Sequence, residues 1–427
     1  MGDLIKLDIL DNIYTDKCNF NQKLLPFATS GVILATVKSA VILSQGDDVK
    51  TVYDLSLSLE EKHEYLPGDT IGIIPKNDAI EVEQLLSRLN VLHVADYECN
   101  LSISEKTTKK NPSLPKHIPT VRSLRTIFLN DIDLRSPPKK LFLKALLKYT
   151  SNPDEIQRLE HLTSTAGSKD YINFISTEGR TLLKLLQAFP SCNPPIEIIL
   201  EHSVMLQARP YSISSSPLAD DYLHVTFFIV ENSDGSKGVC TGWLENLINQ
   251  GGYRKLPIYF RKPTDFRIQA DLSVPTIMIG TGTGISPFIG FLQHMAIQMH
   301  SQGNTSYHNW LIHGCRYENK DALYNSEIAR FLKSGILTKY SLCTSRDTHE
   351  KCYVQDSILK YGDEFVKYVI KMDAVVYICG EFKTVIKDVK SKILEVLCSH
   401  GSLSKDDAEN YYSSLEKNKR IIIDSWI

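Results

Sequence analysis

A glycine-rich stretch, GTGTGISPF, occupies residues 280–288 and follows an apolar run with the length of a buried strand. Glycines at such a point let the backbone approach a ligand, and a helix start would present free N–H groups to a phosphate. The spacing differs from the G-x-G-x-x-G fingerprint, and Pro287 stands where the helix would begin. The stretch indicates a phosphate site, with a simple tight turn as the alternative.

A second polar stretch, SRDTHEKCYVQ, follows the apolar run KYSLCT. Ligands of open α/β sheets bind at the carboxyl ends of the strands, which is where this stretch would begin. Its arginine and lysine could bind a dianionic phosphate and its serine and tyrosine could add hydroxyl donors, whereas an NAD site would need an acidic side chain for the ribose. Without a phosphate loop before it, an exposed basic turn would be the simpler interpretation.

Two more stretches combine groups that suit a large anionic, aromatic ligand. RPYSISSSP, residues 209–217, offers a cation for a phosphate, a ring for stacking and hydroxyls for hydrogen bonds, although a polar strand face is an alternative. KGVCTGWL, residues 237–244, has the form of a glycine-led helix start whose amides could bind a second phosphate. An ordinary capped helix would explain this stretch equally well.

A cysteine and a tryptophan stand where a ligand could meet them. Cys379 ends the apolar run VYIC, where a buried structural cysteine is the commoner case. Trp426 lies one residue from the end of the sequence, in DSWI, where terminal fraying would expose its ring. The ring either packs into the core as part of a C-terminal strand or covers something flat.

The secondary-structure elements that must position these residues show three kinds of sequence pattern along the chain. Strand patterns occupy about residues 30–74, helical spacing prevails from about 78 to 205, strand patterns return in ARPYSISSSP and YLHVTFFIVE, and strands alternate with helices from about residue 274. Within the helical part, Asn152, Pro153 and Glu155 predict a helix start with a capping box. The return of strands indicates that the helical region is inserted into a β domain, and the final alternation predicts a parallel sheet with covering helices.

Composition narrows the functional classes. The 427 residues suggest two or three domains, and the net charge of −2 argues against a general nucleic-acid or membrane-surface binder. The nine cysteines include no C-x-x-C pair, which argues against a zinc site or a disulfide framework. The N-terminal residues lack the features of a signal peptide, and no apolar run has the length of a membrane span. We therefore expect a soluble, cytoplasmic protein without a bound metal.

Together and in this order, the stretches resemble the reductase portion of the diflavin reductases, within the ferredoxin–NADP reductase superfamily. The segments LPGDTIGI, LLQAFPSCNPP, LQARPYSISSS, KGVCTGWL, GTGTGISPFIGFLQH and YVQD carry the likeness, which extends from about Leu66 to Trp426. The resemblance implies an antiparallel FAD-binding β-barrel interrupted by a helical connecting insert, followed by a parallel α/β NADP-binding domain. The implied boundaries are a lead-in over residues 1–27, the barrel over 28–76 and 205–270, the insert over 77–204, and the NADP-binding domain over 271–427.

The resemblance also implies roles for individual residues. The FAD ligands would be Arg209, Tyr211, Ser212, Lys237, Gly238, Val239, Cys240, Thr241 and the shielding Trp426. The NADPH ligands would be Gly280, Thr281, Gly282, Thr283, Gly284, Arg316, Ser345, Arg346, Lys351, Tyr353 and Gln355. The hydride-transfer residues would be Ser212, Cys379 and Asp424, with Trp426 stacked on the flavin until nicotinamide displaces it.

Diflavin reductases also carry an N-terminal FMN domain, and the sequence shows no phosphate loop of that kind before the β domain. We therefore expect FMN on a separate domain or protein. Within this family, the segments look most like those of the members that reduce the cob(II)alamin of methionine synthase. Methionine synthase is therefore the expected final partner. The alternatives are a module that serves a haem or sulfite-reducing partner, and a catalytically silent scaffold that only binds a partner.

Overall fold

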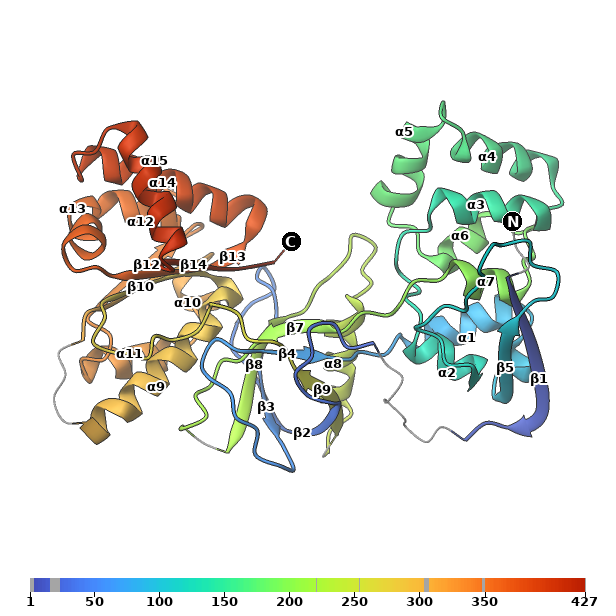
Figure 1. Cartoon of the computed structure of the whole chain (residues 1–427), viewed down its shortest axis with the longest axis horizontal. Helices are drawn as coiled ribbons and strands as arrows, with labels where there is room; N and C mark the ends of the chain where they lie inside the picture. Colours follow the sequence, from blue (N-terminus) through green and yellow to red (C-terminus); the bar gives the residue numbers. More distant parts are fainter. Residues whose placement is uncertain are drawn as a thin grey trace. The chain divides into compact units, whose positions relative to one another are not determined.

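The computed structural model describes residues 4–15, 24–219, 221–252, 254–302, 307–347 and 350–426 (Figure 1). The chain forms two compact units, which are treated separately below. Unit 1 consists of residues 1–26, 74–209 and 238–246, and unit 2 consists of residues 27–73, 210–237 and 247–427.

Unit 1 joins a small antiparallel sheet to a group of helices around one apolar core. The sheet has the order β1-β5-β6, and Ile5 of β1 pairs with Ile103 of β5. The helical spacing of this region did not indicate a sheet, because β1 and β5 are distant in sequence and pair only in the folded chain. The strands are β1 (Ile5–Ile13), β5 (Tyr97–Ile103) and β6 (Val121–Ser123). The helices are α1 (Ala79–Arg88), α2 (Leu124–Asn130), α3 (Lys140–Leu146), α4 (Pro153–Thr163), α5 (Ser168–Tyr171), α6 (Leu182–Ala188) and α7 (Ile196–His202).

The start of α4 shows where local sequence rules hold and where they fail. As predicted, the Asn152 side chain accepts a hydrogen bond from the Asp154 amide, at 2.8 Å, and Pro153 is the first helical residue. The predicted capping box is wrong, because the Glu155 carboxylate accepts the Ser191 hydroxyl, at 2.8 Å. Ser191 Oγ in turn accepts the Asn152 amide, at 3.0 Å. A serine from a later segment thus bridges the two groups that the local rule would have joined directly.

The first half of unit 2 is built on a six-stranded antiparallel sheet with the order β7-β4-β9-β2-β3-β8. An isolated antiparallel bridge between Ile213, just after β7, and Val225 of β8 joins its two edge strands and closes the sheet into a barrel. The strands are β2 (Ile33–Ile42), β3 (Val52–Ser58), β4 (Thr70–Ile73), β7 (Arg209–Ser212), β8 (Tyr222–Phe228) and β9 (Lys255–Phe260). The helix α8 (Val239–Asn249) precedes β9 in the chain and begins in unit 1.

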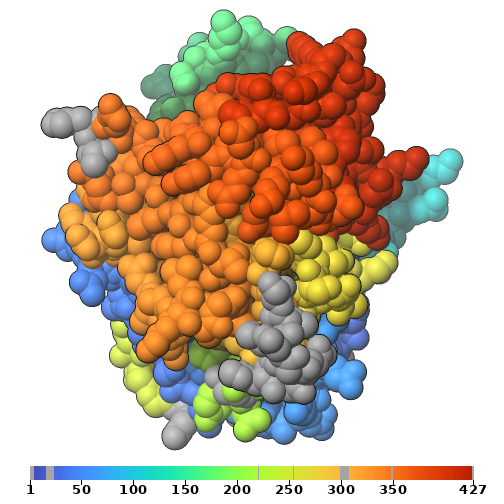
Figure 2. All heavy atoms as spheres, turned by 90° about the vertical axis from the view of Figure 1, so that its left-hand side faces the viewer, coloured from blue at the N-terminus to red at the C-terminus, as the bar shows by residue number. Residues whose placement is uncertain are grey.

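The second half of unit 2 is a five-stranded parallel sheet with the order β12-β11-β10-β13-β14, covered by helices on both faces (Figure 1). One apolar core lies against α12–α15 and the other against α9 and α11. The segments that follow β10 form much of the face seen in Figure 2. The strands are β10 (Thr276–Thr281), β11 (Asn309–Cys315), β12 (Lys339–Thr344), β13 (Val375–Glu381) and β14 (Ile421–Trp426). The helices are α9 (Ser286–Gln302), α10 (Glu318–Asp321), α11 (Asn325–Lys333), α12 (Val354–Lys360), α13 (Gly362–Val366), α14 (Lys387–Ser399) and α15 (Lys405–Lys417).

The predicted fold class, an antiparallel barrel with an insert followed by a parallel α/β domain, is confirmed.

Candidate functional site

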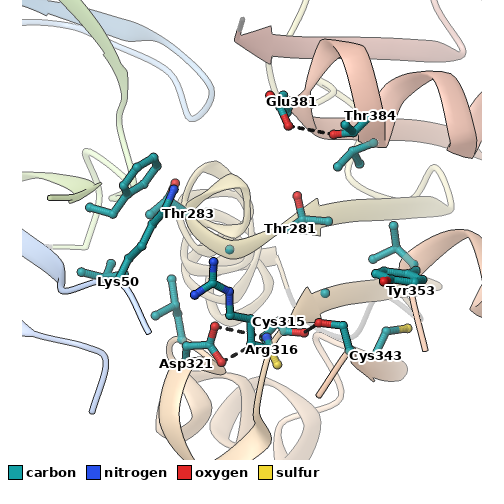
Figure 3. Close-up of a pocket in the computed structure, with 18 of the residues that line it drawn as sticks. Lys50, Thr281, Thr283, Cys315, Arg316, Asp321, Cys343, Tyr353, Glu381 and Thr384 are labelled. Atoms are coloured by element: carbon teal, nitrogen blue, oxygen red, sulfur yellow. Dashed lines mark hydrogen bonds between the residues drawn. The ribbon is translucent and has the colours of Figure 1, made fainter. Parts of the chain in front are cut away.

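The carboxyl ends of the parallel strands border a cavity of about 880 Å³ in unit 2 (Figure 3). β10 lies between β11 and β13, so the order of the strands reverses beside it. Ligands of open α/β sheets bind at such a reversal. The residues predicted from the sequence that line this cavity are Thr281, Gly282, Thr283, Arg316, Ser345, Tyr353 and Gln355.

The glycine-rich turn between β10 and α9 is shaped for close backbone approach. A Cβ atom on Gly280 would lie 2.8 Å from the Gly284 carbonyl oxygen, so the turn closes only around glycine. Gly282 has φ of +52°, and a Cβ there would meet no described atom within 4 Å, so its backbone faces open space. A short 3-10 turn, Gly282–Ile285, then leads into the 17-residue helix α9. Because the first amides of a helix lack intrahelical partners, this turn fits a phosphate.

Two cations from distant parts of the chain line the cavity. The backbone amide of Arg316 donates to the Asp321 carboxylate at 3.1 Å, and its guanidinium donates to the Asp48 carbonyl at 3.2 Å. Lys50 Nζ lies 3.8 Å from the centre of the Phe228 ring. Burial, together with the charge of Arg316, lowers the pKa of Lys50. Sequence reasoning missed Lys50, because a single lysine before a strand carries no local signal.

The segment after β12 carries the residues predicted to bind the 2′-phosphate of NADPH. The Ser345 and Arg346 amides donate to the carbonyls of Cys315, at 3.1 Å, and Arg316, at 2.9 Å, so this segment runs beside the end of β11. Tyr353 precedes α12, and its amide donates to Asp356 at 2.9 Å. Arg346 and Lys351 are exposed and are outside the cavity lining, and no ion pair of either side chain occurs within the described ranges.

Three predicted residues that are far apart in sequence meet in unit 2. The Ser212 hydroxyl, at the end of β7, donates to Asp424 Oδ2 at 2.9 Å. The Cys379 thiol, on β13, points at the same oxygen from 4.0 Å. Cys379 and Asp424 are register partners on adjacent parallel strands, which fixes their approach. The structure therefore forms a Ser212–Asp424–Cys379 cluster.

Burial shifts both acids of this cluster. It raises the pKa of Asp424, while the Ser212 hydrogen bond and the charge of Arg261 partly oppose that rise. Burial, and then the Asp424 charge, raise the pKa of Cys379 well above its ordinary value. Cys379 is 2% exposed and therefore remains a neutral thiol at neutral pH. The cluster thus holds one desolvated carboxylate between two neutral hydrogen donors.

The residues predicted to bind FAD belong to both units and are described unit by unit. In unit 1, the Arg209 guanidinium lies 4.0 Å from Asp133 and also donates to the Gln207 carbonyl. Also in unit 1, α8 starts directly after Gly238, so the amides of the residues from Val239 onward form the positive end of a helix. Cys240 and Thr241 are buried in the first turn, whereas Lys237, which precedes Gly238 in the chain, belongs to unit 2 and is exposed. This donor set fits a pyrophosphate.

In unit 2, the Tyr211 ring packs edge-on against Phe227, with centroids 6.2 Å apart, and is partly exposed. A partly exposed ring of this kind fits stacking against a flat ligand. The backbone of Trp426 pairs with Glu381, a residue of the cavity lining. The Trp426 side chain lies outside the described part of the chain.

Two family models of known proteins match this chain. A family model described as "FAD binding domain" matches residues 25–243. The chain belongs to this FAD-binding family. A second model, "Oxidoreductase NAD-binding domain", matches residues 278–391 of this FAD-binding chain, and those residues include the end of β10, the glycine turn and β11–β13.

Several relatives are similar to this FAD-binding chain over most of its length. Methionine synthase reductase of Rattus norvegicus is 36% identical across 95% of the chain, and that of Homo sapiens is 37% identical across 92%. NADPH–cytochrome P450 reductase of Bos taurus is 33% identical across 95% of the chain. The chain spans 62%, 61% and 60% of the length of these three proteins.

Across the described residues, every helix is too short or too polar to cross a membrane.

Proposed function

We propose that this chain is an NADPH-oxidising flavoprotein reductase module. The observation that carries the proposal is the Ser212–Asp424–Cys379 cluster. β13 connects it to the cavity, since Cys379 lies two residues before the lining residue Glu381. A desolvated carboxylate between neutral donors, next to a nucleotide-sized cavity, suits charge transfer at a nicotinamide. A silent scaffold would gain nothing from the cost of partly burying Asp424.

The cavity and its rim would hold NADPH. The glycine turn at 280–284 would bind the pyrophosphate through backbone amides, and Arg316 would add a positive charge. Ser345 and Tyr353 would offer hydroxyls to the adenosine end. Arg346 and Lys351 are exposed cations on the same segment, and they would form charge-assisted hydrogen bonds with a 2′-phosphate there.

Arg209 and the start of α8 would hold the pyrophosphate of FAD, and Tyr211 would lie against its ring system. With both bound, the chemistry that the two cofactors would supply is hydride transfer from the nicotinamide C4 to the flavin N5. Ser212 would donate a hydrogen bond near the accepting atom, and Cys379 would exclude water beside the nicotinamide. Asp424 would orient both side chains and balance the positive charge that develops on the nicotinamide ring.

The tail residue Trp426 would shield the flavin until nicotinamide arrives. Two features support this role. An indole has the flat apolar area that stacking on a flavin requires, and the Trp426 backbone lies on β14 beside Glu381 of the cavity lining.

The test is an anaerobic stopped-flow experiment on the chain loaded with FAD. We expect NADPH to bleach the flavin absorbance much faster than NADH does at equal concentration, and Ser212→Ala to slow the bleaching without loss of FAD. A protein that takes up no FAD, or a flavin that NADPH leaves oxidised, would overturn the proposal.

We further propose that the electrons pass singly to an FMN domain and then to the cob(II)alamin of methionine synthase, in the cytoplasm. Relatives named methionine synthase reductase, 35–37% identical, support this acceptor. The free thiols of the described cysteines suit a reducing compartment. A P450-type acceptor is the alternative, because relatives of that name are 32–33% identical.

The acceptor can be tested by adding the FMN domain of methionine synthase reductase in one assay and that of P450 reductase in another. We expect NADPH-dependent reactivation of cob(II)alamin methionine synthase in the first assay to exceed cytochrome P450 reduction in the second. The reverse order would favour the P450-type acceptor.

A further inference from the structure

Three cysteines line the cavity, and two of them are on the same wall. Cys315 ends β11, Cys343 is the penultimate residue of β12, and Cys352 directly precedes Tyr353. Figure 3 shows Cys343 and Tyr353 among the lining residues of this cavity. Neither Cys343 nor Cys352 has a role in the nucleotide site described above.

The backbone brings Cys343 and Cys352 together from opposite ends of one segment. The Cys352 amide donates to the carbonyl of Thr344, the residue after Cys343, at 3.0 Å. Cys343 belongs to the apolar core between the sheet and α12–α15, and the Cys352 side chain packs against that same core. Both thiols are free. The Cys343 and Cys352 side chains also hydrogen-bond to each other, so their sulfur atoms are neighbours, as formation of a disulfide requires.

The two thiols differ in a way that assigns them different roles. Cys343 is 1% exposed, whereas Cys352 is half-buried. Burial, and then the neighbouring Cys352 thiol with which it hydrogen-bonds, raise the pKa of Cys343. An oxidant that enters the cavity therefore meets Cys352 first, and Cys343 stands behind it as the resolving thiol.

We propose that Cys343 and Cys352 form a redox-active pair that a hydroperoxide converts to a disulfide, and that bound NADP(H) shields this pair. The Cys352 thiolate attacks the peroxide, so that an S–O bond forms, the O–O bond breaks and the hydroxide released takes up a proton to become water. Cys343 then loses its proton and its sulfur attacks Cys352, so that the S–S bond forms and the S–O bond breaks with release of a second water. The balance is two thiols and one hydrogen peroxide to one disulfide and two waters, and an added dithiol reverses it.

The disulfide would tie the end of β12 to the start of α12 across residues 344–351. That segment carries Ser345, Arg346 and Lys351, which the proposed function assigns to the NADPH 2′-phosphate. The shielding rests on that proposed function, since it requires the nucleotide to occupy the cavity that both thiols line. The thiol pair itself rests only on the positions of Cys343 and Cys352.

The test treats the reduced, FAD-loaded chain with hydrogen peroxide and follows it by intact mass and peptide mapping. We expect loss of two hydrogens and one cross-linked peptide joining Cys343 to Cys352, both reversed by dithiothreitol. Cys352→Ser and Cys343→Ser should abolish the cross-link. Cys398→Ser is the matched control, because Cys398 is also half-buried and packs on the same core. Cross-linking in that variant should be unchanged.

A second arm adds NADP⁺ after its Kd has been measured by calorimetry. At about 100 times Kd only about 1% of sites remain free, so cross-linking should slow about 100-fold. Absence of the cross-link while Cys398 becomes oxidised would overturn the thiol pair. Tight NADP⁺ binding without any slowing would overturn the shielding. A failure of NADP⁺ to bind would instead overturn the proposed function, and the mass shift would still decide the thiol pair.

Discussion

The nucleotide cavity and the Ser212–Asp424–Cys379 cluster lie in the same unit but differ in the solvent exposure of their ionisable side chains. The residues predicted to bind the 2′-phosphate beside the cavity remain near water: Arg346 and Lys351 are exposed, and Tyr353 is 44% exposed. In the cluster, Cys379 is 2% exposed and Asp424 has a raised pKa because it is desolvated. Solvated cations give affinity and selectivity at little cost to folding, whereas a partly buried carboxylate with a raised pKa lowers the stability of the native state.

This difference predicts that substitutions in the cluster change the rate of hydride transfer, whereas substitutions around the cavity change affinity for the nucleotide. The first three predictions below test that division, and the fourth tests the cost of burying a titratable group; they run from the largest expected effect to the smallest.

Asp424→Asn should separate catalysis from stability. Loss of the carboxylate charge should slow flavin reduction by NADPH about 100-fold in stopped flow, the size typical of losing one electrostatic contact. Stability should not fall at neutral pH. Because burial raises the native pKa of Asp424, its contribution to folding is fully present below the unfolded value of 3.8 and is lost as pH rises through the native pKa. Denaturant unfolding at pH 7 that shows a marked loss of stability would contradict the desolvation argument.

Arg346→Ala should act on nucleotide selectivity alone. A charge-assisted hydrogen bond contributes about 1.5–3 kcal/mol, so the KM for NADPH should rise by about 10- to 150-fold. The KM for NADH and the rate at saturation should change little in steady-state assays. Arg330→Ala is the control, because Arg330 is 74% exposed and pairs only with Glu327 among the described residues. An equal effect with NADH would show that Arg346 does not contact a 2′-phosphate.

Trp426→Ala should narrow the preference for NADPH over NADH. In the parent chain, nicotinamide must displace the indole from the flavin, and binding of the 2′-phosphate supplies free energy for that displacement. Without the ring this free energy is not needed, and an aromatic stack contributes about 0.5–1.5 kcal/mol. The ratio of kcat/KM values for NADPH and NADH should therefore fall by about 2- to 10-fold. An unchanged ratio would argue that the ring packs elsewhere.

His313→Phe should make stability less sensitive to acid. His313 is fully buried on β11, its Nε2 has no hydrogen-bond partner in the described chain, and burial lowers its pKa to about 3. Because the native pKa lies below the unfolded value of 6.5, its stabilisation is fully present above pH 6.5 and is lost as pH falls toward 3. Over that window, His313 should contribute about 1.4 kcal/mol per pH unit to the slope of the unfolding free energy, and the variant should lack it.

The control for that measurement is Tyr340→Phe. It removes the hydroxyl that shares a 3.1 Å hydrogen bond with His313 Nδ1 but keeps the histidine. Its acid slope should match that of the parent chain. If His313→Phe has the same slope of unfolding free energy against pH as the parent chain, another group accounts for the acid sensitivity.

Much of the fold could be predicted from local signals. The strand pattern predicted for about residues 30–74 includes β2, Asn152 caps α4, and the glycine-rich stretch forms the turn that opens into the cavity. These features depend on interactions between residues that are close in sequence, so a short segment is enough to predict them. The β1–β5 pairing and the bridge of Ser191 between Asn152 and Glu155 were beyond such reasoning, because their partners come from remote segments.

The sequence by itself determined the types of group that this chain brings to chemistry: a glycine turn for phosphate, cations after a strand, and a serine, a cysteine and a carboxylate in separate stretches. Only the tertiary structure decided which of them meet. Ser212 reaches Asp424 across 212 residues of chain because β7 ends where β14 carries that carboxylate. Lys50 enters the cavity, and Cys343 lies beside Cys352, for the same reason. Burial, and with it the shifted pKa values of Asp424 and Cys379, depends on everything packed around a group, which no short segment specifies.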